Sequence, residues 1–174
     1  MDHFALPDDE LLQAERSGKL HRNFMGYTHQ HTQLLIGLGV SAISDSLYAF
    51  AQNAKVVEDY IRLVDHNLGL IHEGTLPVFK GHILTNDDLV IRRHILNIMC
   101  KGYTSWDHRR GTNNILREAL KRLCPLEEDG LIALNSHGLN VTPTGKRFLR
   151  NICMAMDARL WADKPATQLF SMAI

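Results

Sequence analysis

The chain has 174 residues, of which 45% are hydrophobic and 22% charged, with 19 Lys and Arg residues against 19 Asp and Glu residues. This size suffices to bury a core, and the apolar content excludes a disordered chain. No stretch approaches the run of about 20 apolar residues that a membrane helix needs, and three widely spaced cysteines predict no disulfide scaffold. Zero net charge argues against broad attraction to nucleic acid. We therefore expect a cytoplasmic globular protein that binds neither membrane nor nucleic acid.

Five segments have the pattern of helices. The first is expected from residue 8 or 9 to residue 17, because its first turn is acidic and Gly18 offers a left-handed stop. The others are expected over residues 54–68, 85–100, 114–123 and 144–160, where apolar residues recur with helical spacing. Pro125 is expected to end the fourth helix.

Strand signals are fewer. Leu34–Val40 is apolar on both faces and contains two glycines, which suits a short strand buried on both sides, as in a parallel sheet. Leu131–Leu134 and Leu139–Thr142 flank a polar turn and predict a β-hairpin, whereas residues 70–84 look irregular. The expected fold class is mainly α with a small β-hairpin. The order helix, helix, hairpin, helix over about 85–160 is that of a winged-helix unit.

The sequence contains no motif for a self-sufficient active site. His29 and His31 could share one side of a strand and hold a cation, but no third ligand has matching spacing, and solvated loop residues explain them as well. Cys153 lies in an apolar helix, a setting typical of an inert buried thiol rather than of a nucleophile. No Gly-x-Ser-x-Gly, Walker or dinucleotide-binding fingerprint occurs.

Residues 85–150 form a basic section, with 11 Lys and Arg residues against 7 Asp and Glu residues. Such a section is typical either of a nucleic-acid surface or of the solvated face of a packing domain. The candidates for phosphate contacts are Arg109, Arg110, Arg117, Lys121 and Arg122. A winged-helix DNA-binding or protein-docking module is therefore the alternative hypothesis for this chain.

Several longer strings are more specific than these patterns. They are Met1–Leu11, Leu20–Thr28, Gly37–Ser44, Ala51–Asn53 and Arg150–Met154. In order and spacing they resemble the last third of the oxygen-independent coproporphyrinogen III oxidases, a radical S-adenosylmethionine (SAM) family. The resemblance implies that residues 1–53 are the end of the radical-SAM barrel region. It also implies that residues 54–174 form a helical, winged-helix-like C-terminal domain.

The resemblance also implies a chemistry. The family converts coproporphyrinogen III to protoporphyrinogen IX in heme biosynthesis, using SAM and a [4Fe–4S] cluster held by Cys-x₃-Cys-x₂-Cys. Cys100, Cys124 and Cys153 lack that spacing, so the cluster ligands are expected in an N-terminal radical-SAM barrel outside this chain. The chain is then expected to cover the active site and to be inactive alone. Its expected partners are that barrel and the tetrapyrrole substrate.

Three residues are implied to face the cofactor. The residue matching Ile43 packs against SAM in the family, and the positions matching Phe24 and Met25 face the SAM-containing cavity. Family members commonly carry Gln at the position of Met25 and often Tyr at that of Phe50, so both residues are departures here. Without the resemblance, core packing would explain the same apolar residues.

Substrate carboxylates need cationic partners, and His21 and Arg22 lie close to Phe24 in the sequence. We predict that they contact a propionate group of the substrate, since charge-assisted hydrogen bonds would orient that group. Solvation at the surface is the alternative for Arg22. An unpaired apolar edge at Leu34–Val40 also predicts self-association of the chain in the absence of its barrel.

Overall fold

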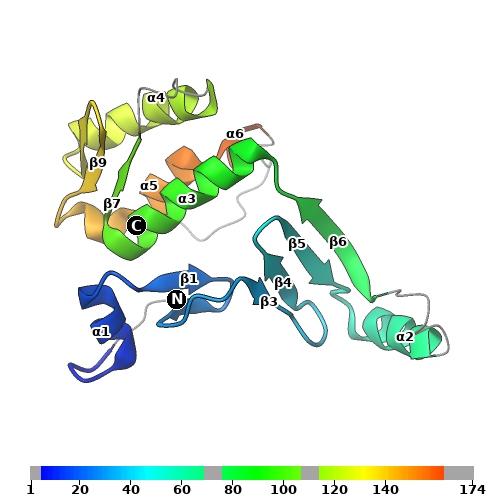
Figure 1. Ribbon diagram of the computed structural model, residues 1–174. Helices are drawn as coiled ribbons and strands as arrows, with labels where there is room; N and C mark the ends of the chain where they lie inside the picture. Colours follow the sequence, from blue (N-terminus) through cyan, green and yellow to red (C-terminus); the bar gives the residue numbers. More distant parts are fainter. Residues whose placement is uncertain (1–4, 69–75, 107–113, 163–174) are drawn as a thin grey trace. The chain divides into compact units, whose positions relative to one another are not determined.

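The computed structural model describes residues 5–68, 76–106 and 114–162, and it divides into two compact units. The first unit is Met1–Leu89 and the second is Val90–Ile174. Asn53, the last residue of the predicted barrel end, lies inside the first unit, because the strand that ends there pairs with a strand further along the chain. Each unit is described by itself below, and Figure 1 colours them along the sequence.

The first unit begins with the predicted helix α1 (Glu10–Arg16). The Asp9 side chain caps it by accepting a hydrogen bond from the Leu11 amide at 2.8 Å, and Gly18 follows with a φ of 70°. Both ends therefore match the sequence signals. A two-stranded antiparallel hairpin follows, formed by β1 (His21–Asn23) and β2 (Gly26–Thr28), which the sequence patterns did not indicate.

A four-stranded antiparallel sheet forms the rest of the β-structure in the first unit, in the order β3-β4-β5-β6. Its strands are β3 (Leu34–Leu35), β4 (Ile43–Ser46), β5 (Ala49–Asn53) and β6 (Val78–Ile83). Helix α2 (Val57–Leu68) connects β5 toward β6 and confirms the second predicted helix. The prediction that residues 70–84 are irregular is wrong for β6; residues 69–75 lie outside the described residues.

The prediction for Leu34–Val40 is also wrong. Only its first two residues form a strand, and β3 pairs antiparallel to β4. Exposure of the apolar side chains is high, with 60% for Leu34, 66% for Ile36 and 87% for Leu38. Gly39 has a φ of 97°, which turns the chain out of the extended geometry that a longer strand requires.

The second unit combines helices with a three-stranded antiparallel sheet of order β7-β9-β8. Its elements are α3 (Asn86–Lys101), which begins in the last residues of the first unit, β7 (Tyr103–Ser105), α4 (Asn114–Glu128), β8 (Ile132–Asn135), β9 (Gly138–Val141), a 3-10 helix η3 (Gly145–Phe148), α5 (Leu149–Met156) and α6 (Ala158–Ala162). The hairpin β8–β9 and the helix α3 were predicted. Strand β7 was not.

The core of the second unit lies between three helices and the sheet. It includes Ile91, Ile98, Leu116, Ala119, Leu123, Ile132, Leu139, Ile152 and Met156, all at most 7% exposed. Burial of these apolar side chains is the main force that holds the unit together.

Two helix ends in this unit differ from prediction. Helix α4 continues through Pro125 to Glu128, because the carbonyl of Pro125 accepts the amide of Asp129 at 3.0 Å and Leu126 packs against the core. The expected helix 144–160 is three pieces, since Asp157 takes an extended conformation with a ψ of 94° between α5 and α6. The structure is therefore one of helices with small sheets, and its β-content exceeds the single hairpin that was expected.

Candidate functional site

The two residues Phe24 and Met25 form the tip of the β1–β2 hairpin. Asn23 pairs with Gly26 across the turn, and the Asn23 Oδ1 atom accepts the Met25 amide at 2.8 Å. This side-chain contact fixes the turn locally. The side chains of Phe24 and Met25 are presented to the surface, at 52% and 78% exposure.

The Phe24 ring contacts the Phe50 ring of β5 edge-to-face, with 5.1 Å between centroids and 86° between planes. This arrangement is the favourable one for two aromatic quadrupoles. The contact brings the hairpin tip onto one face of the four-stranded sheet. Sequence spacing gave no signal for it, although Phe50 had been noted as a departure from the family pattern.

Ile43 lies on the same face of the sheet as Phe50. The register pairs Ile43 with Gln52 and Asp45 with Phe50, and side chains two residues apart in a strand share a face. The register thus places Ile43 and Phe50 on one face of the sheet, together with Asp45 and Gln52, and the Phe24 ring contacts Phe50. Two of these apolar residues, Phe24 and Ile43, were predicted to face the cofactor. Apolar side chains with a few polar groups among them are typical of a small-molecule site.

The two predicted propionate contacts do not converge. His21 and Arg22 are consecutive in β1, so their side chains lie on opposite faces of the hairpin. The guanidinium of Arg22 lies 5.0 Å from the ring centroid of Tyr27, its cross-strand partner. The His21 ring contacts the His31 ring, with centroids 4.4 Å apart. The Arg22 guanidinium and the His21 ring each lie against an aromatic neighbour rather than against each other.

His29 and His31, which were considered as a pair of cation ligands and not predicted as such, contact different partners. The Nε2 atom of His29 lies 3.2 Å from a Glu10 carboxylate oxygen, whereas His31 contacts His21. Across the described ranges 5–68, 76–106 and 114–162, no group of three or more His, Cys, Asp or Glu residues is placed to hold a metal ion.

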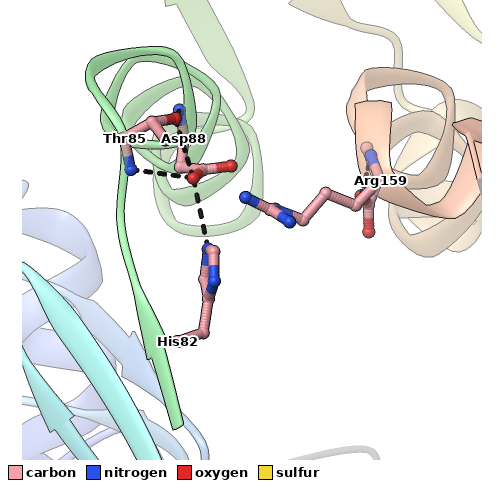
Figure 2. A network of polar contacts seen from close by, with 5 residues as sticks. His82, Thr85, Asp88 and Arg159 are labelled. Atoms are coloured by element: carbon pink, nitrogen blue, oxygen red, sulfur yellow. Dashed lines mark hydrogen bonds and ion pairs between the residues drawn. The ribbon is translucent and has the colours of Figure 1, made fainter.

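A polar network joins the end of β6 to the start of α3 (Figure 2). One Asp88 carboxylate oxygen accepts the amide and the hydroxyl of Thr85, each at 2.8 Å, and lies 3.2 Å from the His82 Nε2 atom. Thr85 in turn accepts the Asp88 amide at 3.2 Å, which completes a reciprocal cap. His82 pairs with Phe50 in the sheet register, so this cap fixes the end of the strand next to the Phe24–Phe50 contact.

The cysteines of this chain do not fit an iron–sulfur cluster. Cys100 is half-buried on α3, Cys124 is exposed on α4, and Cys153 is buried on α5 with its Sγ atom 3.9 Å from the Ile95 carbonyl oxygen. Three thiolates that hold one cluster must converge on it. Ile43, Phe50 and the Phe24 ring offer apolar surface of the kind that an adenosyl group needs, whereas the described residues include no group placed to ligate a cluster.

Two of the five basic candidates for phosphate contacts, Lys121 and Arg122, have partners within the second unit. Arg122 donates from Nε to the Ala155 carbonyl at 2.7 Å, and its guanidinium lies 5.5 Å from the Trp161 ring centroid. Lys121 pairs with Glu118 at 2.7 Å, and this contact lowers the pKa of the Glu118 carboxyl. Arg109 and Arg110 lie outside the described residues. The described contacts thus give a structural role to Arg122, whereas Lys121 forms a surface ion pair and Arg117 is exposed on α4.

Comparison with known proteins gives a consistent result. The chain is 41% identical over its full length to the oxygen-independent coproporphyrinogen III oxidase of Escherichia coli, and 38% identical to that of Synechocystis. A solved structure of the Escherichia coli coproporphyrinogen III oxidase, described as a radical SAM enzyme, aligns with a TM-score of 0.78 at 40% identity. The chain matches the C-terminal part of oxygen-independent coproporphyrinogen III oxidases. The resemblance inferred from the sequence is confirmed.

The chain matches only part of the length of these relatives. The chain spans 37% of the Escherichia coli oxidase and 38% of the Synechocystis oxidase. The structural alignment covers 92% of this chain and 36% of the solved one. No protein-family model matches the chain. None of the helices in the described part of the chain has the length and apolarity to cross a membrane.

Proposed function

We propose that this chain supplies the C-terminal part of an oxygen-independent coproporphyrinogen III oxidase, which converts coproporphyrinogen III to protoporphyrinogen IX. The observation that carries the proposal is the 41% identity over the full chain, supported by the TM-score of 0.78. The radical-SAM barrel that binds the cluster is the proposed partner, and the enzyme works in the cytoplasm. The chain alone lacks cluster ligands and is inactive.

Ile43, Phe24 and Met25 form the part of the SAM site that this chain contributes. When bound with its cluster, SAM supplies the radical that abstracts hydrogen from a substrate propionate. The chain's own residues bind SAM and exclude water from its site. Ile43 and Phe50 lie on one face of the sheet, and Phe24 contacts Phe50. The Met25 thioether lies at the exposed tip, where it offers apolar contact rather than an amide hydrogen bond.

Arg22 and His21 bind substrate carboxylates. Because they lie on opposite faces of the hairpin, each contacts a different propionate rather than both holding one. The Tyr27 ring, 5.0 Å from the guanidinium carbon of Arg22, restrains that side chain, and a guanidinium can bind a carboxylate in a bidentate way. The ring contact with His31 similarly restrains His21.

The two parts of the chain have different roles in this proposal. Residues 1–53 continue the radical-SAM barrel, and the exposed apolar side chains of Leu34, Ile36 and Leu38 contact it. Without the barrel, these side chains promote self-association. Residues 54–174 include a winged-helix unit, supported by the order α3, β7, α4, β8, β9 and by the three-stranded sheet.

A chimeric enzyme tests the proposal. The C-terminal part of the Escherichia coli oxidase is replaced by this chain, and conversion of coproporphyrinogen III is measured anaerobically with SAM and a reductant. We expect protoporphyrinogen IX from the chimera and none from this chain alone. A chimera that folds and carries its cluster but forms no product contradicts the proposal.

The alternative, a DNA-binding module, is tested on the same material. Fluorescence anisotropy with a labelled duplex is measured at low and moderate salt. Binding that weakens steeply with salt would favour a nucleic-acid function, since phosphate contacts release counterions. We expect no such binding, because Arg122 and Lys121 are engaged within the second unit.

A further inference from the structure

The loop between β3 and β4 is held in a conformation that the chain does not favour unaided. Within this loop, Gly39 has a φ of 97° and Ser41, a residue with a side chain, has a φ of 59°. Non-glycine residues adopt such values only where their surroundings enforce them. The contacts that enforce this loop therefore bear on the residue that follows it, Ile43.

Asn53 makes these contacts from the end of β5. Its side chain is buried, and the Nδ2 atom donates to the Gly37 carbonyl at 3.1 Å and to the Gly39 carbonyl at 2.9 Å. Its backbone amide donates to the Ala42 carbonyl at 3.0 Å. One residue thus holds the beginning, the middle and the end of the loop.

The loop is in direct contact with the backbone of Ile43. A Cβ atom placed on Gly37 would lie 2.7 Å from the Ile43 carbonyl oxygen and 2.9 Å from its amide nitrogen, so Gly37 packs without a gap against that residue. The Gly37 amide also donates to the Ser44 hydroxyl at 3.0 Å. A displacement of Gly37 must therefore move the start of β4.

We propose that Asn53 is a positioning residue for the SAM site. Its side-chain amide fixes Gly37 and Gly39, and through Gly37 it sets the backbone position of Ile43. This inference rests on the proposed function, because it takes Ile43 to contact SAM. Asn53 itself does not touch the cofactor. Its substitution is expected to lower the fraction of enzyme in the binding-competent conformation, and with it the apparent affinity for SAM.

The test is carried out on the holoenzyme that contains this chain. Dissociation constants for SAM and for coproporphyrinogen III are measured by equilibrium dialysis for the wild type, Asn53→Ala and Asn53→Asp. Asn53→Asp keeps the side-chain shape but cannot donate to two carbonyls. We expect the dissociation constant for SAM to rise about ten- to thirtyfold in both variants, as the loss of two hydrogen bonds predicts, with less than a twofold change for coproporphyrinogen III.

Leu123→Ala is the control for a merely structural effect. Leu123 is fully buried in the core of the second unit, so its truncation lowers stability without touching the loop. We expect its SAM affinity to equal that of the wild type. Amide hydrogen exchange of Gly37 provides a second readout, which is expected to accelerate in both Asn53 variants and not in the control.

The outcomes separate this inference from the proposed function. A wild-type holoenzyme that fails to bind SAM overturns the proposed function and the inference with it. A wild type that binds SAM, together with an Asn53→Asp variant of equal affinity, overturns the inference alone. An equal loss of affinity for SAM in Leu123→Ala also overturns it, since the effect would then be one of global stability.

Discussion

Acidification is expected to destabilise the second unit through a single buried histidine, His94. This side chain on α3 is fully buried, its Nδ1 atom lies 2.8 Å from the Thr104 hydroxyl, and Nε2 has no hydrogen-bond partner within the described part of the chain. Burial, and to a lesser degree the charge of Arg93, lowers the pKa of His94 from 6.5 to about 4. The folded unit therefore keeps this imidazole neutral.

The sign and size of the effect follow from that pKa difference. Above pH 6.5 the imidazole is neutral in both states and has no effect on pH dependence. Between pH 6.5 and about 4 the unfolded chain binds a proton that the folded unit does not, so the free energy of unfolding falls as pH falls. Each pH unit in this window costs about 1.4 kcal/mol, and the whole window about 3 kcal/mol.

Urea unfolding followed by tryptophan fluorescence measures this effect. Both tryptophans of the chain, Trp106 and Trp161, belong to the second unit, so the signal reports on the unit that contains His94. The variant His94→Gln removes the titrating group, and His137→Gln, at an exposed position of the β8–β9 turn, is the matched control. Parallel loss of stability in the wild type and in His94→Gln between pH 6.5 and 4 would show that His94 does not cause the pH dependence.

Three further substitutions have expected outcomes. Thr85→Ala removes the reciprocal cap with Asp88 and is expected to lower the free energy of unfolding by about 1 kcal/mol in urea titrations; an unchanged midpoint would show that the cap is dispensable. Gly37→Ala places a Cβ atom against the Ile43 backbone, so SAM affinity of the holoenzyme should fall, and an affinity equal to wild type would argue against that close contact. Arg22→Ala should raise the KM for coproporphyrinogen III about tenfold or more without a matching fall in kcat, whereas Arg62→Ala, at an exposed ion pair on α2, should change neither.

The helices were predictable because their signals are local. Asp9 and Gly18 mark the ends of α1 in the sequence and occupy the cap positions in the structure. The end of α4 was mispredicted because packing of Leu126 against the core outweighs the missing amide of Pro125. The residues next to a proline do not reveal tertiary contacts of this kind, so the end of the helix could not be predicted from them.

The sheet of the first unit was missed for a different reason. Strand β5 pairs with β6, although the whole of α2 separates them in the sequence. Strand β4 (Ile43–Ser46) is short and mixes apolar with polar residues, so its sequence does not indicate a strand or its pairing partner. The apolar run at Leu34–Val40 was misinterpreted because its apolarity suits one continuous strand, whereas only Leu34–Leu35 is a strand and Gly39 turns the chain.

Only some of the residues of the candidate site could be predicted from the sequence. Ile43, Phe24 and Met25 were named through the family resemblance, since their apolar character alone fits a core. The contact of Phe24 with Phe50 joins a hairpin to a separate sheet, and no spacing rule connects the two. The hydrogen bonds of Asn53 to two glycine carbonyls likewise depend on the folded loop.

The central claim is that this chain lines the SAM site with the face that carries Ile43 and the hairpin tip at Phe24 and Met25. Photolabelling of the active holoenzyme with an azido-adenine analogue of SAM, followed by peptide mapping, tests it directly. We expect label at these three residues, and we expect SAM to compete it away. Efficient, SAM-competed labelling confined to residues outside this chain would contradict it.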